Sequence, residues 1–128
     1  MNRRIFSIER APQAIGPYSQ AIIYNDLLFV SGQGPVTPSA RKVIDSTLQG
    51  QTRQILCNLR TIIEDAGFSM ENVLKVTAYL ADINDFPAFN KVYQEFFGTS
   101  RPARACIQAG KLPGQWKAEI DAIVGRGG

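Results

Sequence analysis

The chain of 128 residues contains no histidine, and this absence removes the side chain that proteins use most often as a general acid or base near neutral pH. A conventional zinc site is disfavoured as well, because the only two cysteines, Cys57 and Cys106, lie far apart and form no metal-binding motif. No metal is therefore expected. Any catalysis must use carboxylates, tyrosine, lysine, a thiol or an ordered water.

Long apolar runs and a strong charge are also missing. No run approaches the ~20 residues that cross a bilayer, and residues 1–12 lack the apolar core of a secretory signal, so we expect a cytoplasmic protein without a membrane partner. The formal net charge of +3 is too small to indicate nucleic-acid binding by itself. The composition is that of a globular protein, and residues 1–128 are expected to form one domain.

The spacing of apolar residues predicts an α+β fold with elements in the order β-β-β-α-β-α-β-β. Each helix has one apolar face, and two such helices can cover one face of a sheet. Asn25-Asp26 is typical of a tight turn between two strands. The expected strands are residues 3–8, 21–24, 27–31, 73–80, 103–109 and 118–124, and the expected helices are residues 46–66 and 85–98.

The second face of this sheet would remain open to solvent. We expect it to expose alternate strand residues, namely Val76, Ala78, Leu80 and Ile107. An apolar patch of this kind usually marks a partner surface, which predicts a homo-oligomer. The aromatic residues of the second helix also follow helical spacing and are interpreted as core packing; they are Phe86, Phe89, Tyr93, Phe96 and Phe97.

The stretch PARAC, residues 102–106, places an arginine in what otherwise resembles a short buried strand. A guanidinium cannot lose its proton, so a buried one needs an anion. If residues 103–109 and 118–124 form an antiparallel hairpin centred between Lys111 and Leu112, Arg104 lies directly opposite Glu119. Two interpretations remain open at this point, a cross-strand ion pair and an arginine that binds a ligand carboxylate. Cys106 taken alone is interpreted as packing, because no histidine can activate it.

Several motifs together resemble the RidA/YjgF family of imine and enamine deaminases, and the similarity runs essentially from end to end. The resemblance implies a chorismate-mutase-like α+β fold with a mixed sheet and two helices on one face. It also implies a homotrimer with a barrel-like core and sites in the clefts between subunits. The motifs are AIGPYSQA (14–21), VSGQGPV (30–36), VLKVTAYL (73–80), DINDFPAFNKVY (82–93), RPARACI (101–107) and AEIDAI (118–123).

The same resemblance implies a reaction and a set of site residues. Members of the family hydrolyse reactive 2-imino or 2-enamino acids, such as 2-iminobutanoate and 2-iminopropanoate, to 2-keto acids and ammonia, without a metal or an organic cofactor. The carboxylate-binding arginine of the family falls on Arg104, and its water-directing glutamate falls on Glu119. The remaining substrate-binding positions fall on Tyr18, Ser31, Gly32, Asn90 and Cys106.

The chain departs from the family pattern in the loop of residues 38–45, which lacks a glycine that many relatives have, and at Gly110 and Trp116. These departures concern the substrate preference more than the reaction type. Two alternative functions also stay open. A non-catalytic module could bind keto acids or other small carboxylates through Arg104. Some relatives have been described as ribonucleases acting on messenger RNA, for which phosphate contacts could come from Arg3, Arg4, Arg10, Arg53, Arg60 and Arg101.

Overall fold

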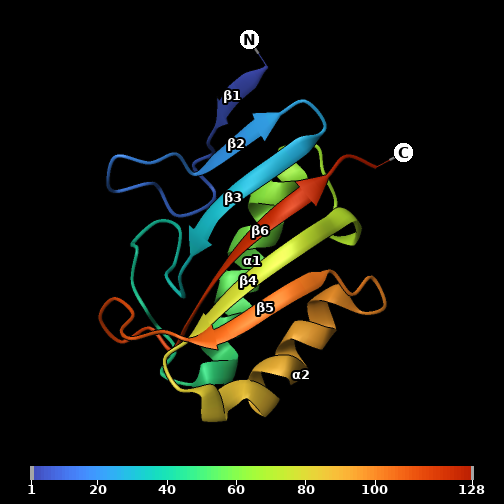
Figure 1. Ribbon diagram of the computed structural model, residues 1–128. Coiled ribbons are helices and arrows are strands. Elements are labelled where there is room, and N and C mark those ends of the chain that lie inside the picture. The colour runs from blue at the N-terminus through green and yellow to red at the C-terminus, as the bar shows by residue number, and fades with distance from the viewer. Residues whose placement is uncertain (1, 128) are drawn as a thin grey trace.

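The computed structural model describes residues 2–127, which form one six-stranded sheet and two α-helices (Figure 1). The observed order of elements confirms the predicted β-β-β-α-β-α-β-β succession. The two helices are α1 (Leu48–Asp65) and α2 (Phe86–Phe97). The strands are β1 (Arg3–Phe6), β2 (Ala21–Tyr24), β3 (Leu27–Gln33), β4 (Val73–Leu80), β5 (Ala103–Gln108) and β6 (Ala118–Gly125).

The sheet is mixed, with the strand order β1-β2-β3-β6-β4-β5. Strands β1, β2 and β3 form an antiparallel meander, and Asn25-Asp26 makes the predicted tight turn, with Asn25 in the left-handed region at φ 52°. Strand β6 is antiparallel to both β3 and β4, whereas β5 is parallel to β4. The last strand in the sequence therefore lies in the middle of the sheet.

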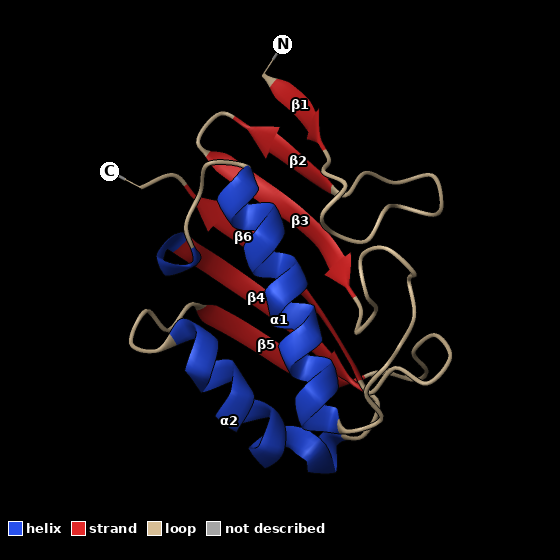
Figure 2. Cartoon of the chain, turned by 180° about the vertical axis from the view of Figure 1, so that it is seen from behind, coloured by secondary structure: helices blue, strands red, loops and turns tan. Residues whose placement is uncertain are grey.

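Both helices pack on the same face of the sheet, as Figure 2 shows and as the sequence predicts. Thr47 caps α1 by accepting a hydrogen bond from the backbone N–H of Gly50 at 3.0 Å. Gly67 follows the helix at φ 85°, a backbone conformation that glycine adopts without strain. The apolar face of α1 is fully buried against the strands, and this layer forms the core.

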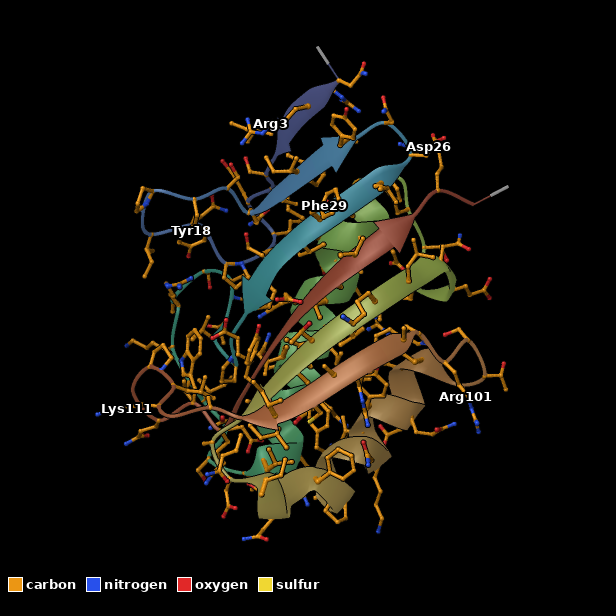
Figure 3. The ribbon with its side chains drawn as sticks, viewed as in Figure 1. Arg3, Tyr18, Asp26, Phe29, Arg101 and Lys111 are labelled. Atoms are coloured by element: carbon orange, nitrogen blue, oxygen red, sulfur yellow. The ribbon has the colours of Figure 1, made fainter. Side chains whose placement is uncertain are left out.

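The prediction about the open face of the sheet is wrong for three of its four residues. Val76, Ala78 and Leu80 are fully buried beneath the helices. Ile107 is half exposed, as predicted. Alternation along a strand separates two faces but does not say which face meets the helices. In β4 the apolar residues Val76, Ala78 and Leu80 face the helices, and Thr77 and Tyr79 face the open side. The open face instead carries a mixture of apolar, aromatic and charged residues, among them Phe29 (Figure 3).

The predicted hairpin between β5 and β6 is also wrong, because β4 lies between these two strands. The α2 crossover places β5 at the edge of the sheet, and the chain then passes the end of β4 to add β6 on its other side. Arg104 consequently pairs with Val76, and Glu119 pairs with Tyr79. Since paired residues point to the same face, Arg104 lies on the helix side of the sheet and Glu119 on the open side.

Neither of the two helices in the described part of the chain combines the length and the apolar character needed to cross a bilayer.

Candidate functional site

Arg104 is half-buried at the sheet edge, and residues of α2 hold it in place. Its Nη1 donates a hydrogen bond to Oδ1 of Asn90 at 2.9 Å. The guanidinium carbon lies 4.7 Å from the ring centroid of Tyr93 and 5.3 Å from that of Phe86, both within cation–π range. We call this arrangement of Asn90, Phe86 and Tyr93 around Arg104 the Arg104 cradle. It contains no carboxylate, and within residues 2–127 Arg104 forms no ion pair.

Tyr93 gives the cradle a second polar group. Its hydroxyl is buried and has no hydrogen-bond partner within residues 2–127. Burial raises the pKa of Tyr93 to about 12, and the neighbouring Arg104 only partly opposes this effect. The hydroxyl is therefore protonated at neutral pH. The interpretation of the aromatic stripe as core packing is confirmed, because Phe89 and Phe97 are buried and the other three rings pack against the core. It missed the contact of Phe86 and Tyr93 with Arg104.

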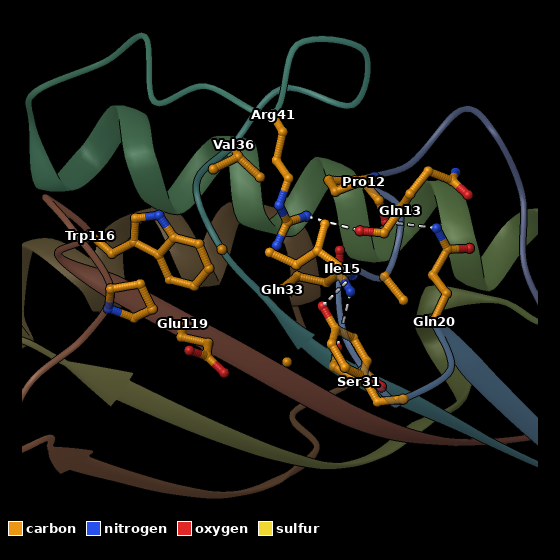
Figure 4. Close-up of a pocket in the computed structure, with 15 residues that line it drawn as sticks. Pro12, Gln13, Ile15, Gln20, Ser31, Gln33, Val36, Arg41, Trp116 and Glu119 are labelled. Atoms are coloured by element: carbon orange, nitrogen blue, oxygen red, sulfur yellow. Dashed lines mark hydrogen bonds between the residues drawn. The ribbon is translucent and has the colours of Figure 1, made fainter.

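Glu119 faces a separate cavity of about 480 Å³ on the open side of the sheet (Figure 4). We call it the Glu119 cavity. Three further predicted site residues line it, namely Tyr18, Ser31 and Gly32. Its volume lies within the range that is typical of small-molecule sites.

A bulge in β3 shapes the floor of the Glu119 cavity. Val30 pairs with Ala122 and Gln33 pairs with Ile120, so β3 has one more residue than β6 across this interval. The bulge contains Ser31 and Gly32. A Cβ atom on Gly32 would overlap the carboxylate of Glu119, so glycine at this position leaves the room that the carboxylate occupies.

Ser31 connects the bulge to the loop that carries Tyr18. Its hydroxyl donates to the carbonyl oxygen of Ser19 at 2.6 Å, and its backbone N–H donates to the carbonyl of Gln20 at 3.1 Å. Within the loop, the Tyr18 hydroxyl accepts a hydrogen bond from the N–H of Ile15 at 3.4 Å, while about half of the side chain remains exposed. Tyr18 is thus held through its hydroxyl group, and its side chain lines the cavity.

The pKa of the Glu119 carboxyl is raised, first by burial and second by the negative charge of Asp121. Both causes favour a carboxylate that accepts a proton more readily than an exposed glutamate does. The thiol of Cys106, on the same face of β5 as Arg104, also has a raised pKa, because burial outweighs the opposing effect of Arg104. A raised pKa reduces the thiolate fraction, which favours packing over nucleophilic attack for Cys106.

The seven predicted site residues thus divide into two groups that one chain does not bring together. Asn90, Arg104 and Cys106 lie on the helix side of the sheet, near its β5 edge. The other four line the cavity on the open side.

Among the cavity residues that were not assigned a role from sequence are Arg41 and Trp116. Both coincide with departures from the family pattern: Arg41 lies in the loop that lacks a glycine, and Trp116 is itself uncommon. These two departures were the features of the sequence that could have pointed to Arg41 and Trp116 as cavity residues. Trp116 lies flat over Gly34, where a Cβ atom would overlap its ring.

The six arginines considered for RNA contacts do not form one surface. Arg10 pairs with Asp65, Arg53 pairs with Glu95 at 3.0 Å, and Arg60 packs over the ring of Phe96. Arg3 lies in β1 at one edge of the sheet, and Arg101 precedes β5 at the other edge (Figure 3). A groove that follows a nucleic-acid backbone needs contiguous positive charge, which this distribution does not supply.

Comparison with known proteins gives consistent matches over nearly the whole chain. The profile of the family described as "Endoribonuclease L-PSP" matches residues 8–125. A RutC family protein of Pyrococcus horikoshii is 45% identical over 121 residues, which are 94% of this chain and 96% of that protein. The 2-iminobutanoate/2-iminopropanoate deaminase of Capra hircus is 42% identical over 125 residues, 98% of this chain and 91% of the relative. The structure of E. coli TdcF with bound serine superimposes with a TM-score of 0.90 at 38% identity, covering 97% of this chain and 99% of the other.

The electrostatics of the cavity lead to a testable prediction. Replacing Asp121 with Asn should lower the pKa of Glu119, because it removes the like charge, but the pKa should stay above that of an exposed glutamate because the larger cause is burial. Carbon-13 NMR of the side-chain carboxyl as a function of pH measures this value. Glu71→Gln removes an equal charge near the other end of β4 and should leave the titration unchanged. An unchanged titration in Asp121→Asn would show that Asp121 does not act on Glu119.

Proposed function

Since the chain belongs to the RidA/YjgF family, which is also described as endoribonuclease L-PSP, we propose that it hydrolyses 2-imino and 2-enamino acids such as 2-iminobutanoate and 2-iminopropanoate to 2-keto acids and ammonia. The observation that carries this proposal is Arg104, a half-buried cation held by an amide and two aromatic rings without an acidic partner in residues 2–127. Such a guanidinium is ready to receive the carboxylate of a ligand. Mammalian relatives about 40% identical are named for this deaminase activity.

In the proposed reaction, Arg104 binds the substrate carboxylate through two parallel hydrogen bonds and holds the imine carbon in place. Glu119 orients a water molecule and accepts one of its protons while the oxygen attacks that carbon. Attack on the protonated imine gives a neutral carbinolamine, and Glu119 returns the proton to its nitrogen. The C–N bond then breaks to release ammonia, while the hydroxyl group gives its proton to the Glu119 carboxylate and becomes the carbonyl of the 2-keto acid. An imine is electrophilic already, so no covalent nucleophile is needed, and Cys106 forms part of the wall.

The two groups of site residues must meet for this reaction, and we propose that they do so between copies of the chain. One copy would supply the Arg104 cradle and its neighbour the Glu119 cavity, with three such sites in a homotrimer. The exposed apolar residues of the open face, among them Phe29 and Ile107, favour contact with another copy.

A non-catalytic module that binds small carboxylates is the second candidate. The structure of a 38% identical relative with bound serine favours it, because serine carries a carboxylate that an arginine can bind. Binding and hydrolysis would share Arg104, whereas only hydrolysis requires Glu119. Cleavage of RNA receives less support, since the arginines are scattered.

The first test is imine hydrolysis. An imine generated in situ from threonine or alanine, by a dehydratase or an amino-acid oxidase, is trapped with semicarbazide, and an active protein lowers the yield of trapped product. Arg104→Ala should reduce this activity by about two orders of magnitude or more, since it removes charged hydrogen bonds to the substrate. Cys106→Ala should keep most of it. Arg60→Ala, which removes an arginine that is not part of the cradle, controls for net charge. Equal activity in Arg104→Ala and wild type would contradict the assigned role.

Glu119→Gln separates the enzyme from the binding module. The amide keeps the size of the side chain but is a poor proton acceptor, so turnover should fall strongly while affinity for a 2-keto acid, measured by calorimetry, should change little. Wild-type protein that binds 2-ketobutanoate but hydrolyses no imine would identify the binding module instead.

Mixing two inactive variants tests whether the site lies between copies. Arg104→Ala and Glu119→Gln, unfolded together in equal amounts and refolded, should regain about a quarter of the wild-type activity, because about a quarter of the interfaces join an intact Arg104 to an intact Glu119. Each variant refolded alone should stay inactive. If both residues of a site came from one chain, the mixture would stay inactive as well.

A further inference from the structure

Arg41 has a backbone conformation that arginine rarely adopts. Its φ is 50°, in the left-handed region that glycine occupies freely and other residues occupy at a cost of about 1 kcal/mol or more. Two hydrogen bonds between backbone groups fix this turn: the N–H of Arg41 donates to the carbonyl of Thr37, and the N–H of Thr37 donates to the carbonyl of Lys42, both at 2.9 Å. The fold thus keeps an arginine at a strained position.

The turn directs the Arg41 side chain toward the Glu119 cavity, and its guanidinium forms part of the cavity wall (Figure 4). Nη1 donates a hydrogen bond to the carbonyl oxygen of Gln13 at 3.0 Å. This contact holds the side chain at a defined place on the wall. A guanidinium has five N–H groups, so most of its donors remain for a ligand.

No acidic residue neutralises Arg41 in residues 2–127. It forms no ion pair there, although Glu119 lines the same cavity. A neutral donor could make the same hydrogen bond to Gln13 and connect the two loops equally well. The positive charge of Arg41 is not needed for that connection.

We propose that Arg41 selects substrates with an acidic side chain, namely 2-imino dicarboxylic acids of four or five carbons. This inference rests on the proposed function. The α-carboxylate binds Arg104 of the neighbouring copy, the imine carbon faces the water held by Glu119, and the distal carboxylate binds the free donors of Arg41. Water adds to the C=N bond and ammonia leaves, so that a 2-imino dicarboxylate gives a 2-keto dicarboxylate.

The lining of the cavity suits a short substrate of this kind. Ile15, Val36 and Trp116 supply apolar walls, which suit a methylene chain between two charged ends. Gly34 lets the Trp116 ring lie directly against the backbone, which fixes one wall. Arg41 and Glu119 are the two charged side chains of this lining, and Glu119 is assigned to the water. Arg41 is therefore the group that can recognise a second anion.

The test compares two ligands of equal length that differ in the distal carboxylate, 2-oxoglutarate and 2-oxopentanoate. Calorimetry should show that the wild-type protein binds 2-oxoglutarate more tightly, and that Arg41→Gly reduces this preference by about ten- to hundredfold while leaving 2-oxopentanoate unchanged. Glycine suits the positive φ, so the loop should keep its conformation. Lys42→Ala removes the adjacent, exposed cation and should leave the preference intact.

The outcomes separate this inference from the proposed function. Equal binding of the two ligands by wild type, or a preference that survives in Arg41→Gly, would overturn the role of Arg41. Hydrolysis is measured in parallel with the imines of glutamate and norvaline, generated by amino-acid oxidases. If wild type hydrolyses the glutamate imine faster than the norvaline imine and Arg41→Gly does not, Arg41 selects the substrate in catalysis as well as in binding. If neither imine is hydrolysed while the binding preference holds, the proposed reaction fails but the assignment of Arg41 as the selective group in the cavity stands.

Discussion

Paired residues of neighbouring strands point to the same face of a β-sheet, and this constraint determines where the two proposed catalytic residues lie. Arg104 pairs with Val76, which is buried beneath the helices, so Arg104 shares the helix side. Glu119 pairs with Tyr79 and lies on the open side. A single chain therefore carries two separate parts of the proposed site, and in that proposal oligomerisation becomes a condition of catalysis rather than an aid to stability.

The surroundings act differently on the charged group of each part. Around Arg104, neutral groups stabilise the charge. An amide oxygen accepts a hydrogen bond and two rings face the guanidinium, so the positive charge is stabilised without being neutralised. Around Glu119, burial and the like charge of Asp121 raise the affinity for a proton. An ion pair between the two residues within one chain would have neutralised both. Their separation preserves an anion-binding group and a proton acceptor in the same small protein.

Local features were predictable from the sequence and non-local ones were not. Helical spacing located α1 and α2, and Asn25-Asp26 located the β2–β3 turn, because these patterns depend on neighbouring residues. The β5–β6 hairpin and the exposed face of β4 were predicted wrongly, because strand order depends on how a nine-residue connection and a helical crossover pass around the sheet.

The site shows the same division. Motif residues could be named from the resemblance, and four of them meet in one cavity. The contacts of Phe86 and Tyr93 with Arg104 were hidden, because a helical stripe of aromatic residues looks the same whether it fills a core or supports a cation. Arg41 was hidden for a related reason: an isolated cation in a loop gives no sign of its direction until the turn around it is known.

The central place of β6 has a consequence for the newly made chain. β6 is the last described strand to be synthesised, yet both β3 and β4 use it as a hydrogen-bonding partner. Until it arrives, the β1–β3 meander and the β4–α2–β5 unit each present an unpaired inner edge with strongly apolar neighbours. Unpaired edges of this kind invite pairing with other chains. The sheet can therefore be completed only after β6 has been made and has paired with both β3 and β4.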